Sequence, residues 1–221
     1  MQSQSRTRLI FVVVLLVAAG IGVFVATRGD DGGSSGGSAG DCRQVSKPPP
    51  KKEQFKKPEP VLARGQDALA TVETSCGTFT IDLNTEQSPK TANSFAFLAQ
   101  KGFYDGTVFH RIAPGFVIQG GDPTGSGNGG PGYTVTEPPP QNTTYGNGVV
   151  AMAKTAVEPP GASGSQFFVV IAPADAGLPP DYALLGRVTD GMDVVDAIGK
   201  LGDAQEKPTQ VVTIDKVTIE N

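Results

Sequence analysis

The stretch Val108-Phe-His-Arg-Ile-Ala-Pro-Gly-Phe-Val-Ile-Gln-Gly-Gly-Asp122 places an arginine, an aromatic residue and an amide on two short strand-like runs. A Pro-Gly turn at residues 114–115 separates the runs, as is typical of a connection between neighbouring strands. About forty residues further on, Gly164-Ser-Gln-Phe-Phe-Val-Val170 forms another strand-like run with an amide and an aromatic residue. Together these segments predict a β structure with functional side chains on adjacent strands.

The rest of the C-terminal region continues this pattern of short strands. Cys76 and Gly77 are expected to form a two-residue hairpin turn, and Ser88 and Pro89 to start a helix that Gly102 ends. A second helix is expected at residues 192–198. Strands are expected at residues 69–75, 78–83, 107–112, 116–119, 149–153, 166–171, 183–188 and 211–219. This pattern predicts a mainly β domain, a closed eight-stranded antiparallel barrel capped by two α-helices.

From about Ala70 to the C-terminus, these segments and their order closely resemble the cyclophilin family of peptidyl-prolyl cis-trans isomerases. The resemblance implies a cyclophilin-like domain over residues 66–221. It also implies isomerisation of the peptide bond before proline, in unfolded or proline-containing polypeptides. The runs at residues 108–122 and 164–170 carry most of the resemblance.

The same resemblance implies a role for particular side chains. Arg111 is the expected catalytic cation, with Phe116, Gln119 and Phe168 as its catalytic partners. The residues implied in substrate binding surround this group: His110, Met152, Ala153, Lys154, Gln166, Leu178 and Tyr182. Among them, Met152 and Leu178 are expected to hold the proline ring with the two phenylalanines, and Gln166 to position the arginine with Gln119.

Prolyl isomerisation suits a chain without acid, base or metal groups at its site. The barrier of about 18–20 kcal/mol arises from amide resonance, which a cation that donates toward the prolyl nitrogen opposes. His110 is the only histidine, so neither a catalytic metal site nor a Ser-His-Asp triad is well supported, and no cofactor or metal is expected. The alternative is a non-catalytic proline-peptide binding module or chaperone that uses the same groove.

Some positions depart from the family pattern. Lys154 stands where many cyclophilins have asparagine, Gly177 where many have tryptophan, and Tyr182 where many have histidine. These changes are expected to alter the rim of the groove and to leave the arginine mechanism intact. The run Gly125–Gly130 fits a G-x-G-x-x-G pattern, but no helix is expected after it, so it is interpreted as a loop and not as a phosphate site.

The N-terminal region contains a candidate membrane anchor. Residues 9–27 carry no charged side chain, and 19 residues of helix extend about 28 Å, close to the hydrocarbon thickness of a bilayer. Arg6 and Arg8 precede this window, which predicts residues 1–8 in the cytoplasm and the domain outside. A cleaved signal peptide is the alternative. The sequence thus predicts a bacterial, single-pass cell-membrane protein with an extracytoplasmic catalytic domain.

Residues 28–65 are expected to be a linker, rich in Gly and Ser at first and in Lys and Pro afterwards. The simplest interpretation of this linker is a spacer. The alternative is that its lysines contact anionic lipid or wall polymer. The two cysteines, Cys42 and Cys76, would both lie in an oxidising compartment, where a disulfide between them is favoured and two free thiols are the alternative.

The charge of the predicted domain limits its partners. Residues 66–221 carry 8 Lys and Arg against 17 Asp and Glu, a net charge of −9. Such an acidic domain argues against nucleic acid as a partner. A monomer is expected, with polypeptide substrates and the membrane as its partners.

Overall fold

The computed structural model describes residues 42–221. The predicted tail 1–8, the predicted span 9–27 and the predicted linker up to residue 41 lie outside the described residues. Over residues 42–221, no helix combines the length and the apolar character that crossing a bilayer requires. The membrane topology therefore stays a prediction.

One antiparallel sheet of nine strands forms most of the described chain, in the order β3-β11-β1-β2-β10-β7-β9-β5-β4. Its strands are β1 (Leu69–Thr74), β2 (Gly77–Leu83), β3 (Thr107–Val108), β4 (Arg111–Ala113), β5 (Val117–Gly120), β7 (Val149–Met152), β9 (Phe167–Val170), β10 (Leu184–Asp190) and β11 (Thr213–Glu220). A small second sheet pairs β6 (Val135–Thr136) with β8 (Ala162–Ser163). The mainly β class is confirmed. The second sheet was not predicted, because two-residue strands carry no periodic pattern.

The hydrogen-bonded sheet does not close into the predicted barrel. Its edge strands β3 and β4 are consecutive parts of one extended segment, separated by Phe109 and His110, and they do not pair with each other. The predicted single strand 107–112 is split because its first part pairs with β11 and its last part with β5. The prediction of a closed eight-stranded barrel is therefore wrong: the two edges are linked by chain continuity, and the only pairing across the gap between them in the described chain is an isolated bridge between Val108 and Asp122.

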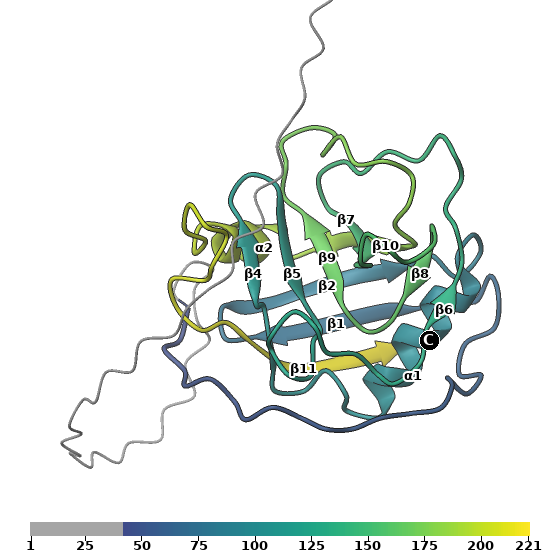
Figure 1. Ribbon diagram of the computed structural model, residues 1–221, viewed down its shortest axis with the longest axis horizontal. Coiled ribbons are helices and arrows are strands. Elements are labelled where there is room, and N and C mark those ends of the chain that lie inside the picture. The colour runs from purple at the N-terminus through teal and green to yellow at the C-terminus, as the bar shows by residue number, and fades with distance from the viewer. Residues whose placement is uncertain (1–41) are drawn as a thin grey trace, which may run out of the picture. The chain divides into compact units, whose positions relative to one another are not determined.

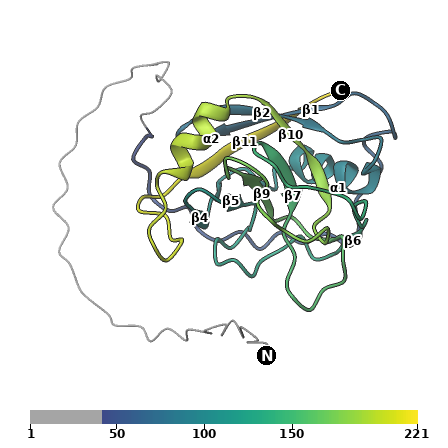
Figure 2. The same cartoon turned by 90° about the horizontal axis from the view of Figure 1, so that it is seen from above.

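Two helices, α1 (Pro89–Gln100) and α2 (Met192–Gly199), lie at opposite ends of the sheet in both views (Figure 1 and Figure 2). Both were predicted from the sequence. The apolar face of α1 is buried: Phe95 and Leu98 are fully enclosed, and Ala99 nearly so. This face packs into the main core together with the inward side chains of β1, β2 and β11.

The start of α1 is capped from a distance. Ser88 occupies the N-cap position and Pro89 the first turn, as predicted, but the Ser88 side chain makes no capping hydrogen bond. The Glu137 carboxylate instead accepts hydrogen bonds from the backbone N–H groups of Lys90 and Thr91, at 3.3 and 2.8 Å. A carboxylate is favourable there because helix N-termini expose unpaired N–H groups and carry positive partial charge. The segment after β6 is thereby fixed to the helix.

Residues 42–62, called the strap below, lie against the domain and differ from the spacer that was predicted up to residue 65. Figure 1 shows the strap as the dark blue trace that passes below β11 and α1. Its backbone N–H groups donate to domain carbonyls: Arg43 to Ser75, Lys51 to Pro123 and Phe55 to Pro131, at 2.7–2.8 Å. An extended Pro-rich segment has no internal hydrogen bonds, so its N–H groups are free to bind a neighbouring surface.

A disulfide joins the first residue of the strap to the first hairpin. The bond links Cys42 to Cys76, which are 34 positions apart in the sequence. Cys76 lies in the turn between β1 and β2 and is buried, and the turn comprises Ser75 and Cys76, since Gly77 already pairs with Thr74. The predicted turn at Cys76 and Gly77 was therefore displaced by one residue.

Candidate functional site

Three neighbouring strands bring the predicted catalytic residues together. Arg111 on β4 lies directly opposite Gln119 on β5, and Gln119 lies directly opposite Phe168 on β9. Directly opposed residues on antiparallel strands present their side chains on the same face. The row Arg111, Gln119, Phe168 therefore follows from the register of the sheet, although 57 positions separate its ends.

The Arg111 guanidinium is held at two of its nitrogens. Its Nε donates to Glu206 Oε2 at 2.7 Å, and its Nη1 donates to Gln119 Oε1 at 3.2 Å. Its Nη2 has no hydrogen-bond partner within residues 42–221. Since arginine is planar and permanently charged, two fixed edges determine where the remaining donors point. The Arg111 side chain is 35% exposed, so these donors are accessible to a ligand.

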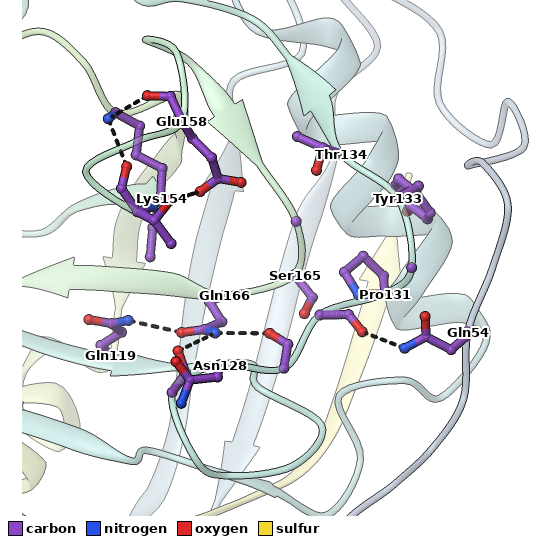
Figure 3. A pocket seen from close by; sticks show the side chains of 17 residues that line it. Gln54, Gln119, Asn128, Pro131, Tyr133, Thr134, Lys154, Glu158, Ser165 and Gln166 are labelled. Carbon is purple, nitrogen blue, oxygen red and sulfur yellow. Dashed lines mark hydrogen bonds between the residues drawn. The ribbon is translucent and has the colours of Figure 1, made fainter.

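A chain of amides connects the arginine to a glycine-rich loop, and Figure 3 shows the part of this chain from Gln119 through Gln166 to the loop. Gln119 Nε2 donates to Gln166 Oε1 at 3.0 Å. Gln166 Nε2 donates in turn to the carbonyl oxygens of Gly127 and Gly129, at 3.0 and 2.9 Å. Each amide is therefore oriented by the next group, as expected for the pair predicted to position substrate and arginine.

The glycine-rich loop has its own internal support. The Asp122 carboxylate accepts hydrogen bonds from the N–H of Thr124 and of Ser126, at 2.7 and 3.0 Å, and also from Gly127. Burial acts to raise the pKa of Asp122, but these hydrogen bonds outweigh it and lower the pKa below its usual value. No helix follows Gly130, which confirms that the G-x-G-x-x-G run is a loop, and it presents carbonyl oxygens where a phosphate site would need N–H groups.

An apolar surface adjoins the arginine. Phe168 and Val117 are buried in a cluster against which Phe116 and Leu178 are partly buried. The Arg111 guanidinium lies 5.9 Å from the centre of the Phe116 ring. A cation beside an apolar surface is the combination that gripping and polarising a prolyl bond would require.

Met152 does not belong to this surface, contrary to its predicted role. It is 1% exposed and packs in the main core, while its neighbour Ala151 faces the apolar cluster. Val117 occupies the position on the apolar surface that was predicted for Met152. It pairs with Ala113 and lies on the same face of β5 as Gln119, two residues away. The alternation from Gln119 back to Val117 could have identified this residue from the sequence.

His110 does not line the groove either, in contrast to its predicted substrate-binding role. It lies beside a separate cavity of about 310 Å³, lined also by Lys47, Val108 and Gln210. As the neighbour of Arg111 in an extended segment, it faces the opposite side. Burial lowers the pKa of His110, and the nearby Asp122 carboxylate opposes this shift without cancelling it.

The remaining predicted binding residues lie on the rim. The Ala153 N–H donates to the Gln166 carbonyl at 2.9 Å, so that N–H is not free to pair with a substrate. Lys154 Nζ donates to the carbonyls of Thr155 and Glu158, both at 3.1 Å, and lies 5.8 Å from the Tyr182 ring.

Tyr182 is fixed in turn by a second tyrosine. The Tyr145 hydroxyl donates to the Tyr182 carbonyl at 2.7 Å and accepts from the Tyr182 N–H at 3.1 Å. Burial raises the pKa of Tyr145 to about 12, so the hydroxyl stays protonated and keeps donating. The Tyr182 ring meets Phe168 edge to face, with 5.5 Å between ring centres.

A pocket of about 480 Å³ opens beside the amide chain, on the side of the loop. Gln119 and Gln166 form its boundary with the arginine, and Ala153 and Lys154 form another side. Gln54, from the strap, belongs to its lining as well. The site thus comprises an arginine row with an apolar surface and a polar pocket beside it.

Comparison with known protein families shows which family this chain belongs to. The family described as "Cyclophilin type peptidyl-prolyl cis-trans isomerase/CLD" matches residues 69–219, well over half of the chain. The match includes Arg111, Gln119, Gln166 and Phe168 but not Gln54. The chain belongs to the cyclophilin family. This family is one of peptidyl-prolyl cis-trans isomerases, so the predicted enzyme class is confirmed.

Known cyclophilins agree with this membership. A "Peptidyl-prolyl cis-trans isomerase-like 1" of Neurospora crassa is 42% identical over 153 residues, which cover 67% of this chain and 91% of the relative. The protein of that name from Homo sapiens is 40% identical over 150 residues, covering 66% and 88%. A cyclophilin-type isomerase structure from Cryptosporidium parvum has a TM-score of 0.64 at 30% identity, covering 71% and 99%. These relatives are eukaryotic, and a bacterial source stays a prediction.

Two parts of this cyclophilin's site were missed from the sequence. Glu206 binds Arg111 from 95 positions away, and Gly127 and Gly129 bind Gln166 through backbone carbonyls that no side-chain pattern reveals. The only sequence signal for Glu206 was that it is a carboxylate in a polar loop, and many exposed residues share that property.

Proposed function

We propose that this cyclophilin accelerates cis–trans isomerisation of X-Pro bonds in unfolded or proline-containing polypeptides on the extracytoplasmic side of a membrane. The observation that carries the proposal is the doubly held Arg111, whose Nη2 donors have no partner among the described residues and lie next to an apolar surface. The related Cryptosporidium parvum enzyme was also crystallised in the presence of the dipeptide Ala-Pro, and that structure has a TM-score of 0.63. A proline peptide is therefore the appropriate ligand class.

The geometry suggests how the bond would rotate. A proline ring would rest on Phe116, Val117, Phe168 and Leu178, and this contact is equally available to the cis and trans forms. As the preceding carbonyl turns out of conjugation, the prolyl nitrogen gains a lone pair that accepts a hydrogen bond from Arg111. This bond exists only in the twisted state, and so it lowers the barrier rather than merely binding the substrate.

The extracytoplasmic location is supported by the sequence and by one contact. The uncharged window 9–27 after Arg6 and Arg8 predicts the topology. The Cys42–Cys76 disulfide is of the kind that persists in oxidising compartments.

A proline-peptide isomerisation assay on the full-length protein tests the activity. The wild type should accelerate isomerisation of a short Ala-Pro peptide, and Arg111→Ala should lower kcat/KM by about 100-fold, the usual effect of removing one transition-state donor. Arg64→Ala, at an exposed surface arginine, is the matched control and should keep the wild-type rate. A folded Arg111→Ala protein with full activity would refute the mechanism, and peptide binding without any catalysis would favour the binding module.

A further inference from the structure

The glycine-rich loop, residues 123–132, is bound by donors from two distant parts of the chain. Gln166 donates to the carbonyls of Gly127 and Gly129, in the middle of the loop. The strap donates to four carbonyls, two at each end of the loop: Lys51 N–H to Pro123 (2.8 Å), Lys47 Nζ to Gly125 (3.1 Å), Gln54 Nε2 to Gly130 (3.2 Å) and Phe55 N–H to Pro131 (2.7 Å). Figure 3 shows one contact of each kind, made by Gln166 and by Gln54. The acceptors of Gln166 therefore lie between segments that the strap holds.

The loop does not fix these carbonyls by itself. Five of its ten residues are glycine, the residue that loses most backbone freedom on folding, so the loop has little stiffness of its own. The Asp122 carboxylate orders it from within by accepting from N–H groups, among them those of Thr124 and Ser126. A carboxylate cannot donate to a carbonyl, and so the direction of the carbonyls depends on donors outside the loop.

The strap is fixed to the core at the same two residues that donate their N–H groups to the loop. Lys51 Nζ donates to three carbonyls beyond the end of α1: Gly102, Phe103 and Asp105, at 2.7, 2.9 and 3.1 Å. The Phe55 ring packs against the rings of Phe97 and Phe103, with centres 5.3 and 6.2 Å apart, and both of those rings are buried. Lys51 and Phe55 thus each join the core, through the side chain, to the loop, through the backbone.

The route from the loop to the arginine is continuous. Loop carbonyls bind Gln166 Nε2, which leaves its Oε1 to accept from Gln119 Nε2 at 3.0 Å. Gln119 Oε1 is thereby directed to Arg111 Nη1, at 3.2 Å. If the loop carbonyls moved away, the Gln166 amide would be free to turn over, and its NH₂ would then face the NH₂ of Gln119. Two donors cannot pair, so the hold of Gln119 on the arginine would be lost.

We propose that the strap positions Arg111, and that Lys51 and Phe55 are positioning residues that act through the loop, Gln166 and Gln119. The effect on catalysis rests on the proposed function. Neither residue belongs to the lining of the polar pocket, and both lie outside the cyclophilin match at residues 69–219. The strap therefore adds a support for the arginine that the matched domain does not contain.

A double variant tests the proposal on the full-length protein. Lys51→Ala with Phe55→Ala removes both side-chain anchors and leaves the groove residues in place. It should lower kcat for an Ala-Pro peptide by about fivefold, the effect of one net hydrogen bond, and change KM little, since the apolar surface is retained. In a Gln166→Ala background the same double variant should have almost no further effect, because the route to Arg111 is already cut.

A matched control lies one position further along the strap. Lys52→Ala with Lys56→Ala removes two exposed lysines and should keep the wild-type kcat. Melting curves give a temperature at which every variant is folded, and the rates are compared there. Full activity of the Lys51→Ala, Phe55→Ala protein would overturn the proposal. So would an equal loss with and without Gln166, which would mean that the strap acts by another route.

Nitrogen-15 NMR separates this inference from the proposed function. The Lys51→Ala, Phe55→Ala protein should show shifted side-chain amide signals for Gln119 and Gln166 and a shifted Nε–H signal for Arg111, whereas the control variant should not. Unshifted signals would overturn the positioning role. If the wild type does not isomerise the peptide, the proposed function fails, and these signals still decide whether the strap orients the arginine.

Discussion

Glu206 is the residue that most extends the predicted site. It binds Arg111 on the side away from Gln119, and it is the only non-glycine residue within 42–221 with a positive φ, at 63°. Such a conformation costs on the order of 1 kcal/mol or more and is often found at functional sites. Its backbone carbonyl also accepts from Ile112 N–H at 3.0 Å, so both ends of the residue are fixed to β4.

We expect Glu206→Ala to lower kcat/KM by about three- to tenfold, less than Arg111→Ala, because Gln119 still holds the guanidinium. The ion pair is partly exposed, which limits its worth. Isomerisation kinetics and the melting temperature should be measured together, with the exposed Glu73→Ala as control. A loss of activity equal to that of Arg111→Ala would mean that Glu206 acts directly on the substrate.

His110 should make stability depend on pH. Burial lowers its pKa in the folded protein, so between that value and the ordinary value near 6.5 the unfolded chain binds more protons. Its contribution to stability is therefore complete above about pH 6.5 and falls as the pH is lowered. Denaturant unfolding at pH 7 and pH 5 measures this, and His110→Gln should reduce the slope. Equal slopes for the two proteins would show that His110 does not titrate differently on folding.

At the scale of elements, the strap adds a stabilising layer that depends on its disulfide. Loop-entropy arguments give about 3–4 kcal/mol for a bridge across 34 positions. We expect Cys42→Ala with Cys76→Ala to lower the free energy of unfolding by roughly this amount, measured in denaturant. Hydrogen exchange should accelerate at Arg43 N–H before Phe55 N–H, because aromatic packing still holds the latter. Unchanged stability and exchange, or free thiols in protein from its native source, would contradict a structural role.

The elements that could be predicted are those with local signals. The helix that starts at Pro89 and the hairpin after Thr74 follow from caps, turn residues and alternation. Arg111, Gln119 and Phe168 could be predicted because they lie in the runs 108–122 and 164–170, which carry the family resemblance. Met152 was misplaced because all four residues of β7 are buried, so burial on both sides hides which face each side chain takes. The strap could not be predicted, because its composition is that of a linker and its contacts are with distant carbonyls.

At the scale of the whole molecule, the predicted membrane anchor at residues 9–27 can be tested directly. We expect the protein in the membrane fraction. We also expect protease added to intact cells or spheroplasts to cut the chain between the predicted span and the domain, and so to release the domain. The mass of the mature N-terminus separates an uncleaved anchor from a cleaved signal peptide. If the domain is protected from protease until the cells are lysed, the predicted topology is wrong.

If residues 9–27 anchor the chain in a membrane, as the sequence predicts, the packed strap limits how far from the bilayer the enzyme can work. With residues 9–27 as the span and the domain beginning at Cys42, only the 14 residues 28–41 connect them, compared with the 38 residues of the predicted linker. At about 3.5 Å each, 14 residues reach at most about 50 Å. The groove would thus serve a thin layer next to the membrane surface, so its substrates would be chains that enter this layer and not polypeptides in the distant bulk.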